Sequence, residues 1–246
     1  MLPVLVRWFL FLLLESLMGV TLRVWNRADF IVAVDVGHSL KEGGALSARG
    51  VPEFLFNRDL AEAVISELNL QGFRNLFLIG VLGDALTLKE RAQLALAKRA
   101  NLLVSLHHDS VQPKYLSTWI YEQRQLSYCD RFHGYSIFYS ERNGSPKASL
   151  EFAHLLGEEL RNSGCIPSLH HAENIKGERR QLLDGELGTY RFDDLVVLKS
   201  SAMPAVLLEA GIIVNRAEEV RLADPQTQKL MAASIARAVV WFSLND

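Results

Sequence analysis

The sequence contains little cysteine. Cys129 and Cys165 are the only two among 246 residues, and they lack the C-x-x-C spacing that is typical of a redox or structural metal site. In an exported protein the two thiols could form a disulfide, or they could be separate buried or free thiols. Their spacing leaves both alternatives open and excludes only a site built on a C-x-x-C pair.

The sequence also lacks an excess of charge of either sign. Lysine and arginine total 26, aspartate and glutamate total 28, and the net charge is −2. No dense basic stripe of the kind that binds a phosphate backbone is present, so we predict no nucleic-acid partner.

Low-complexity tracts, internal repeats and a Pro/Gly/Ser-rich linker after residue 30 are absent as well. A chain of 246 residues of which 49% are hydrophobic can bury a substantial core. These features together predict a single folded domain, which we assign to residues 28–246.

The N-terminal segment differs from the rest of the chain. Arg7 precedes an apolar stretch over residues 8–20 that only Glu15 and Ser16 interrupt. This stretch is short for a membrane span but suits the apolar core of a secretory signal. We therefore predict that residues 1–27 are a signal peptide or an N-terminal anchor, and that the protein is exported to the periplasm or cell envelope. A buried N-terminal helix is the alternative, and no A-x-A-like cleavage site is evident.

Short apolar runs alternate with helical patterns along the chain. Strands are predicted for residues 30–36, 75–81, 101–106, 135–139, 195–198 and 205–209. Because nearly every position in these runs is apolar, several should be covered on both faces, as in a mostly parallel sheet. Helices are predicted for residues 52–72, 87–100, 149–164 and 224–242, with Thr87, Ser149 and Asp224 as N-caps. This alternation predicts a three-layer α/β fold, with a mostly parallel mixed twisted sheet flanked by helices.

Polar residues follow three of the predicted strands, at the edge where an α/β sheet usually binds its ligands. His38 follows the first strand, His107 follows the run 101–106, and Glu209 ends the last strand. Taken singly, each has an ordinary structural explanation, although a carboxylate at the tip of an apolar strand needs a partner.

With Glu53, at the start of the first predicted helix, these residues have the composition of a hydrolytic metal centre. Two imidazoles and one carboxylate are the usual ligands of a catalytic zinc, which keeps one position open for water. A further carboxylate can accept that water's proton. The wide separation of the four residues excludes the single-helix H-E-x-x-H arrangement, so they would have to converge from separate elements.

Five ordered motifs resemble those of the zinc-dependent N-acetylmuramoyl-L-alanine amidases, which trim bacterial peptidoglycan. They are VAVDVGHS (32–39), RGVPEFLFNRDLAEAV (49–64), LKERAQLALAKRANLLVSLHHDS (88–110), HGYSIFYS (133–140) and MPAVLLEAGIIVNRAEEVRL (203–222). The resemblance extends from about residue 30 to residue 242 and implies a single-domain, phosphorylase/hydrolase-like α/β fold.

The resemblance also implies an activity and a site. His38, Glu53 and His107 would bind one zinc ion, and Glu209 would be the catalytic base. The substrate would be peptidoglycan or its fragments, cut at the amide bond between N-acetylmuramic acid and L-alanine. Asp35 would orient His38, because imidazole ligands commonly need such support.

The motifs indicate the roles of other nearby residues less specifically. His108 and Asp109 would shape the rim of the site or bind substrate. His170, His171 and Glu173 form a tight cluster, but nothing else in the sequence completes a second ligand set, so we predict a single zinc ion.

Two stretches, residues 111–132 and 168–192, are longer than a minimal catalytic domain of this kind requires. We expect both to lie over or beside the cleft. Some relatives block the zinc with an inserted segment until a partner removes it, so a lid within residues 171–187 and a protein activator are hypotheses.

Two alternative functions stay open. Another zinc amide hydrolase on the same scaffold would cut within a peptide, as carboxypeptidase-like enzymes do, and product identity separates it from an amidase. A non-catalytic wall-binding pseudo-enzyme would be favoured by the loss of any of the four site residues, and all four are present.

Overall fold

The computed structural model describes residues 27–244. The signal peptide or anchor predicted for residues 1–27 therefore lies, except for Arg27, outside the described residues. Within the described part of the chain, no helix has both the length and the apolar character needed to cross a membrane.

Strands and helices alternate along the described chain. The strands are β1 (Ile31–Val36), β2 (Asn75–Ile79), β3 (Leu102–Asp109), β4 (Ser117–Tyr121), β5 (Arg124–Tyr128), β6 (Ser136–Tyr139), β7 (Gln181–Asp184), β8 (Thr189–Arg191) and β9 (Ala205–Ile212). The helices are α2 (Glu53–Leu70), α3 (Leu88–Ala97), α4 (Pro146–Asn162), α5 (Val196–Lys199), α6 (Arg216–Ala223) and α7 (Pro225–Ser243), with short 3-10 helices η1 (Pro113–Tyr115) and η2 (His170–Ala172).

Seven of these strands form one mixed sheet in the order β2-β1-β3-β9-β6-β8-β7, while β4 and β5 form a separate hairpin. Strands β2, β1, β3 and β9 are parallel to one another, whereas β6 is antiparallel to β9 and β7 to β8. Parallel strands place their carboxyl ends at the same edge of the sheet, so the segments after β1, β3 and β9 meet there.

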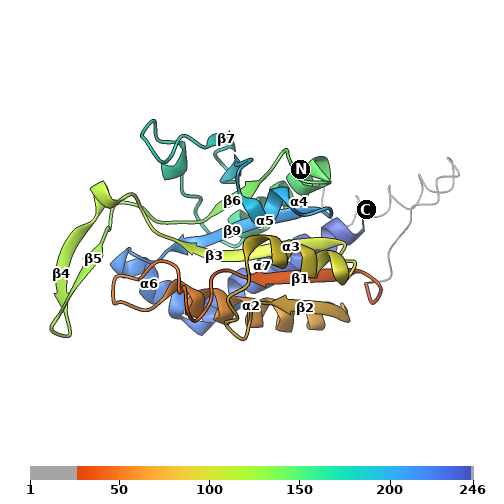
Figure 1. Ribbon diagram of the computed structural model, residues 1–246, viewed down its shortest axis with the longest axis horizontal. Coiled ribbons are helices and arrows are strands. Elements are labelled where there is room, and N and C mark those ends of the chain that lie inside the picture. The colour runs from red at the N-terminus through yellow and green to blue at the C-terminus, as the bar shows by residue number, and fades with distance from the viewer. Residues whose placement is uncertain (1–26, 245–246) are drawn as a thin grey trace, which may run out of the picture.

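Helices cover both faces of the sheet (Figure 1). Helices α2, α4 and α7 pack on the face that receives Val34 and Val104, whereas α3 and α5 pack on the face that receives Ala33 and Leu103. Because successive strand residues point to opposite faces, strands buried on both faces need apolar residues at nearly every position. The predicted three-layer α/β fold with a mostly parallel mixed sheet is confirmed.

Two local predictions are wrong. Residues 196–199 form the single-turn helix α5, so the strand predicted for residues 195–198 does not exist. Such a short apolar run has no period that separates a strand from a buried helical turn. Helix α4 begins at Pro146 rather than at Ser149, whose buried hydroxyl instead accepts a hydrogen bond from the Ala205 N–H at 3.0 Å.

Other local predictions are confirmed. Thr87 caps α3, and its capping box with Glu90 is complete, while the Asp224 side chain caps α7. Both cysteines are free thiols, with Cys129 buried and Cys165 partly buried, which decides between the two alternatives that their spacing left open.

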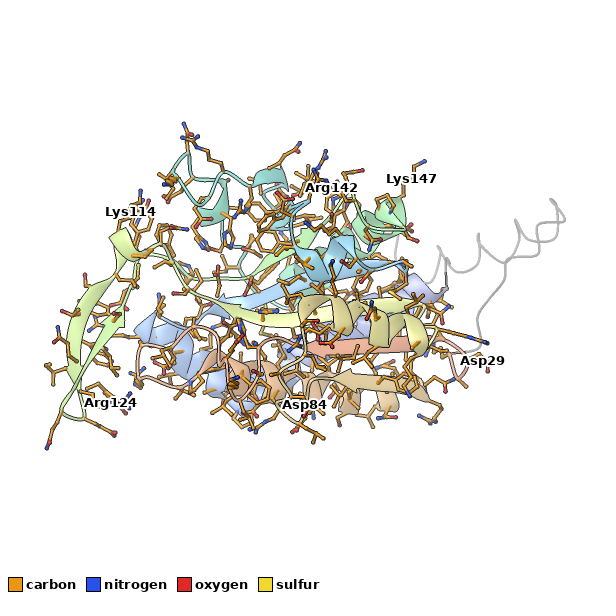
Figure 2. All side chains as sticks on the ribbon, in the orientation of Figure 1. Asp29, Asp84, Lys114, Arg124, Arg142 and Lys147 are labelled. Carbon is orange, nitrogen blue, oxygen red and sulfur yellow. The ribbon has the colours of Figure 1, made fainter. Side chains whose placement is uncertain are left out.

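The first long stretch, residues 111–132, contains η1 and the β4–β5 hairpin. This hairpin projects from the body of the sheet (Figure 1), with Lys114 and Arg124 toward its opposite ends (Figure 2). Its Trp119 indole donates a hydrogen bond to the Ala48 carbonyl at 2.8 Å. The hairpin therefore contacts the loop that precedes α2.

The second long stretch, residues 168–192, contains η2, β7 and β8 and extends the sheet at its far edge. Glu178 and Arg180 of this stretch line a pocket together with Glu209. The expectation that it lies beside the cleft is confirmed, and its strands belong to the main sheet.

Candidate metal centre

Three potential metal ligands converge at the carboxyl edge of the parallel strands. His38 follows β1, His107 lies near the end of β3, and Glu53 is the first residue of α2. The Glu53 carboxylate lies 3.1 Å from His38 Nε2 and 3.0 Å from His107 Nδ1. One ligand atom from each residue lies within 4.8 Å of the others. The structure thus brings together the three residues that the resemblance assigns to zinc.

Two glycines leave room for the close approach of these side chains. A Cβ atom at Gly37 would lie 2.4 Å from the His107 ring, and one at Gly44 would lie 2.4 Å from Glu53 Oε2. Gly44 also has a φ of +77°, which disfavours any larger residue. With two imidazoles, one carboxylate and this cradle, the residues fit a cation of the zinc class.

Neighbouring groups hold Glu53 in its ionised form. Its carboxylate accepts hydrogen bonds from the backbone N–H groups of Ala45 at 3.0 Å and His108 at 3.2 Å, and from the Asn57 amide at 3.2 Å. Burial would raise the pKa of Glu53, but its contacts with His107 and His38 outweigh burial and lower the pKa below the ordinary value. Glu53 is therefore available as an anionic ligand.

Asn57 connects the carboxylate ligand to its surroundings, because its amide also donates to the Gly37 carbonyl at 3.1 Å. We expect Asn57→Ala to weaken zinc binding about 10- to 100-fold, as loss of an orienting partner typically does. Competition with a chromophoric chelator measures this affinity. Asn69→Ala, at an exposed site on the same helix, is the matched control. Unchanged affinity in Asn57→Ala would show that Glu53 needs no such support.

Asp35 does not orient the His38 ring, contrary to the prediction. Its carboxylate instead accepts hydrogen bonds from Arg91 at 2.7 Å and from the Ser105 hydroxyl at 2.6 Å. The Arg91 guanidinium also donates to the carbonyls of Val36 and His38. Asp35 thus acts on the backbone of His38 through Arg91, and that backbone has a φ of 67°, which non-glycine residues seldom adopt.

Arg91 and Asp35 form a buried ion pair, with side chains 3% and 1% exposed. We expect Arg91→Met to destabilise the protein by about 3–5 kcal/mol, because it leaves the Asp35 carboxylate buried without a counter-charge. Urea unfolding measures the loss, and the double variant with Asp35→Asn should recover part of it. Arg142→Met removes an exposed ion pair with Asp194 and should cost less than about 1 kcal/mol. Equal losses of unfolding free energy in Arg91→Met and Arg142→Met would contradict a structural role for Arg91.

His108 does not lie at the rim of the site. It is 3% exposed, contacts the Phe56 ring, and donates from Nδ1 to Asn57 Oδ1 at 2.8 Å. Burial lowers the pKa of His108 to about 4, so the imidazole is neutral at ordinary pH. The predicted contact of His108 with substrate does not fit this position, and we assign it to the support of Asn57.

Glu209 stands beside the three ligands. It is the register partner of His107 on the neighbouring strand β9, and its buried Oε2 atom has no hydrogen-bond partner among the described residues. Burial raises the pKa of Glu209 well above its ordinary value, and the carboxylates of Asp109 and Glu53 raise it further. Glu209 also lines a cavity of about 280 Å³. An unpaired carboxyl in a pocket is the arrangement expected of a group that exchanges protons.

The structure completes the His170–His171 cluster with Asp109, a residue that sequence reasoning did not group with it. Asp109, His170 and His171 bring potential ligand atoms within 4.8 Å of one another. Glu173, which the sequence grouped with the two histidines, instead accepts a hydrogen bond from the Tyr115 hydroxyl at 2.5 Å. No sequence signal links Asp109 to the histidines, because the contact depends on the path of the long loop after α4.

A parallel sheet edge with two imidazoles, a carboxylate that could bind a metal and an adjacent unpaired carboxyl is the arrangement expected of a metal-dependent hydrolase. The sequence matches the N-acetylmuramoyl-L-alanine amidase family over residues 32–240. This match spans most of the chain, and the chain belongs to that family of hydrolytic enzymes. The family resemblance of the five motifs is confirmed.

Individual relatives agree with this assignment. The chain is 25% identical to a putative N-acetylmuramoyl-L-alanine amidase of Buchnera aphidicola, across 87% of this chain and 97% of that protein. It is 24% identical to an N-acetylmuramoyl-L-alanine amidase of Mycobacterium tuberculosis, across 88% of each.

Solved structures share the fold. The amidase Ami1 of Mycobacterium smegmatis superposes with a TM-score of 0.69 at 22% identity, covering 89% of this chain and 99% of that one. The CwlD amidase of Clostridioides difficile, solved in complex with the GerS lipoprotein, has a TM-score of 0.59 at 20% identity and covers 87% and 98%.

Proposed function

We propose that this protein is a zinc-dependent hydrolase that cleaves the amide bond between N-acetylmuramic acid and L-alanine in peptidoglycan. The observation that carries this proposal is the unpaired Glu209 carboxyl beside the triad of His38, Glu53 and His107. The membership of the chain in the amidase family supplies the substrate class.

In this proposal His38, Glu53 and His107 hold the zinc ion and Glu209 moves protons. Zinc, when bound, would supply a Lewis acid that acidifies water and polarises a carbonyl. The Glu209 carboxylate accepts a proton from the attacking water and then donates it to the leaving amine nitrogen. One water is consumed, and the products are a lactyl carboxylate on the glycan strand and a stem peptide with a free L-alanine amine.

The position of Glu209 suits both halves of this proton transfer. The pairing of β9 with β3 fixes the backbone of Glu209. Its Oε2 atom has no hydrogen-bond partner among the described residues that would compete for the proton. The raised pKa of Glu209 makes its conjugate acid easy to form, and positive charge near the carboxyl would favour the ionised form that acts as the base.

We also propose that the protein is exported to the periplasm or cell envelope, with residues 1–27 as its signal peptide or anchor. Peptidoglycan or its fragments would then be accessible to the pocket. A protein activator is part of this proposal, supported by the lipoprotein-bound CwlD neighbour. The loop of residues 168–192, which borders the pocket, is the surface we assign to it.

Mass spectrometry of the products from purified peptidoglycan, incubated with the protein and zinc, tests the proposal. We expect stem peptides that begin with a free L-alanine amine. Fragments cut within the stem peptide would identify a carboxypeptidase-like hydrolase instead. Intact wall, with and without a stoichiometric excess of candidate activator lipoproteins, would identify a non-catalytic wall-binding protein.

A further inference from the structure

A second group of potential metal ligands lies beside Glu209. The Asp109 Oδ2 atom is 3.1 Å from Nε2 of His170 and 2.9 Å from Nε2 of His171. The two imidazole rings lie close together, with centroids 3.9 Å apart and planes inclined by 36°. Each ring thus presents its Nε2 atom to the same carboxylate oxygen of Asp109.

These atoms lie within ion-pair distance of one another. Asp109 Oδ2, His170 Nε2 and His171 Nε2 are buried without a hydrogen-bond partner among the described residues, and Glu209 Oε2 shares this property. A buried polar atom without a partner typically costs about 1–3 kcal/mol. Such atoms gathered in one place therefore indicate a ligand that satisfies them together.

The second ring nitrogen of His171 is held by a neighbouring carboxylate. Its Nδ1 lies 2.9 Å from Glu178 Oε2, and Gln112 donates to the other oxygen of Glu178 at 2.7 Å. Because an ionised carboxylate can only accept, Nδ1 carries a proton, and Nε2 is the nitrogen that remains to face Asp109. A cation of the zinc class placed here could bind this Nε2 atom and the Asp109 oxygen together.

His170 has support of the same kind, since its Nδ1 lies 2.9 Å from the Ser168 hydroxyl. Metal-binding histidines usually have their second nitrogen held in this way. Burial lowers the pKa of His171, but Asp109 and Glu178 outweigh burial and raise it to about 9, so metal binding would release the proton on Nε2.

We propose that Asp109, His170 and His171 bind a second divalent cation of the zinc class. Two imidazole nitrogens and one carboxylate oxygen are a donor set that favours zinc over magnesium or calcium. The bound cation joins η2, on the long loop after α4, to the end of β3 and closes one wall of the pocket that contains Glu209. This proposal adds a second ion to the single zinc that the sequence predicts, and it does not depend on the proposed reaction.

The zinc content of the full-length protein tests this proposal. The protein is equilibrated with zinc, dialysed, and analysed by plasma mass spectrometry together with its concentration. We expect two zinc ions per wild-type chain, and one per chain in either His171→Ala or His107→Ala. Glu173→Gln, which alters a neighbouring acid outside the cluster, should keep both ions.

The variants separate the two sites. A single zinc ion in the wild type that His107→Ala removes and His171→Ala does not would overturn the second site and leave the proposed function intact. A single ion that only His171→Ala removes would support the second site and contradict the proposed function. Should His171→Ala fail to fold, Asp109→Asn, which preserves side-chain size, decides: two retained ions overturn the proposal, and loss of one supports it.

Discussion

The Glu209→Gln protein is expected to lose nearly all hydrolysis of peptidoglycan while keeping its fold and its zinc. The substitution preserves the size of the side chain but removes the group that accepts and returns a proton. General acid–base catalysis typically contributes about 100- to 10,000-fold in rate. We expect a fall of that size in kcat, measured as release of stem peptides with a free L-alanine amine.

The matched control for this experiment is Glu151→Gln, on the exposed surface of α4. It should keep the wild-type rate, and both variants should have wild-type zinc content. The raised pKa of Glu209 in the folded protein lowers stability above the ordinary pKa of glutamate, because the carboxyl ionises more easily in the unfolded chain. Gln has no such cost, so Glu209→Gln should not be less stable than the wild type above neutral pH. A Glu209→Gln protein with wild-type kcat would exclude Glu209 as the proton carrier.

Removal of the metal is expected to abolish the activity and to lower the melting temperature. A ligand that binds only the folded state stabilises it, by about 4 kcal/mol when its concentration is 1,000 times its dissociation constant. Chelation reverses that contribution, and differential scanning calorimetry with and without the chelator measures it. Added zinc should restore both the activity and the melting temperature.

Two controls make the chelation experiment specific. Magnesium should restore neither property, because two imidazoles are poor ligands for it. His38→Ala should show low activity that zinc cannot restore, because the triad then lacks one ligand. Full activity in the presence of the chelator, with zinc shown to be absent, would mean that the hydrolysis needs no metal.

The fold could be predicted where strands are buried on both faces. β1, β3 and β9 are apolar at nearly every position because both faces are covered: α2 packs on β1 and β3, α4 packs on β9, and α3 and α5 contribute to the core on the opposite face. The strands β4, β5, β7 and β8 were missed for the opposite reason. β4 and β5 are largely exposed, β7 lies at the edge of the sheet, and β8 is buried but only three residues long, so none of them carries a clear apolar pattern.

The triad and Glu209 could be predicted because they stand in motifs that resemble the amidase family and lie near strand ends or a helix start. His38 follows β1, while His107 and Glu209 lie in the C-terminal halves of β3 and β9, and parallel strands bring these ends to one edge. The contacts of Arg91 and Asn57 could not be predicted in the same way. They depend on how α3 and α2 pack against the sheet, which the helical pattern alone does not specify.

The Asp109 cluster was beyond sequence reasoning for a related physical reason. Asp109 is the last residue of β3, which continues beyond the run 101–106 that the sequence predicts as a strand. The histidines that face it come from a 3-10 turn in a loop, and the conformation of such a turn follows from tertiary contacts. The sequence grouped the histidines with Glu173 because proximity along the chain was the only guide.

The most direct test of the central claim is anomalous diffraction from crystals of the zinc-loaded protein, recorded on both sides of the zinc absorption edge. We predict a strong anomalous peak bound by His38, Glu53 and His107, next to the Glu209 carboxyl. Crystals of His107→Ala grown in the same way should lack this peak. No anomalous peak at the triad in the zinc-loaded wild type would contradict the account.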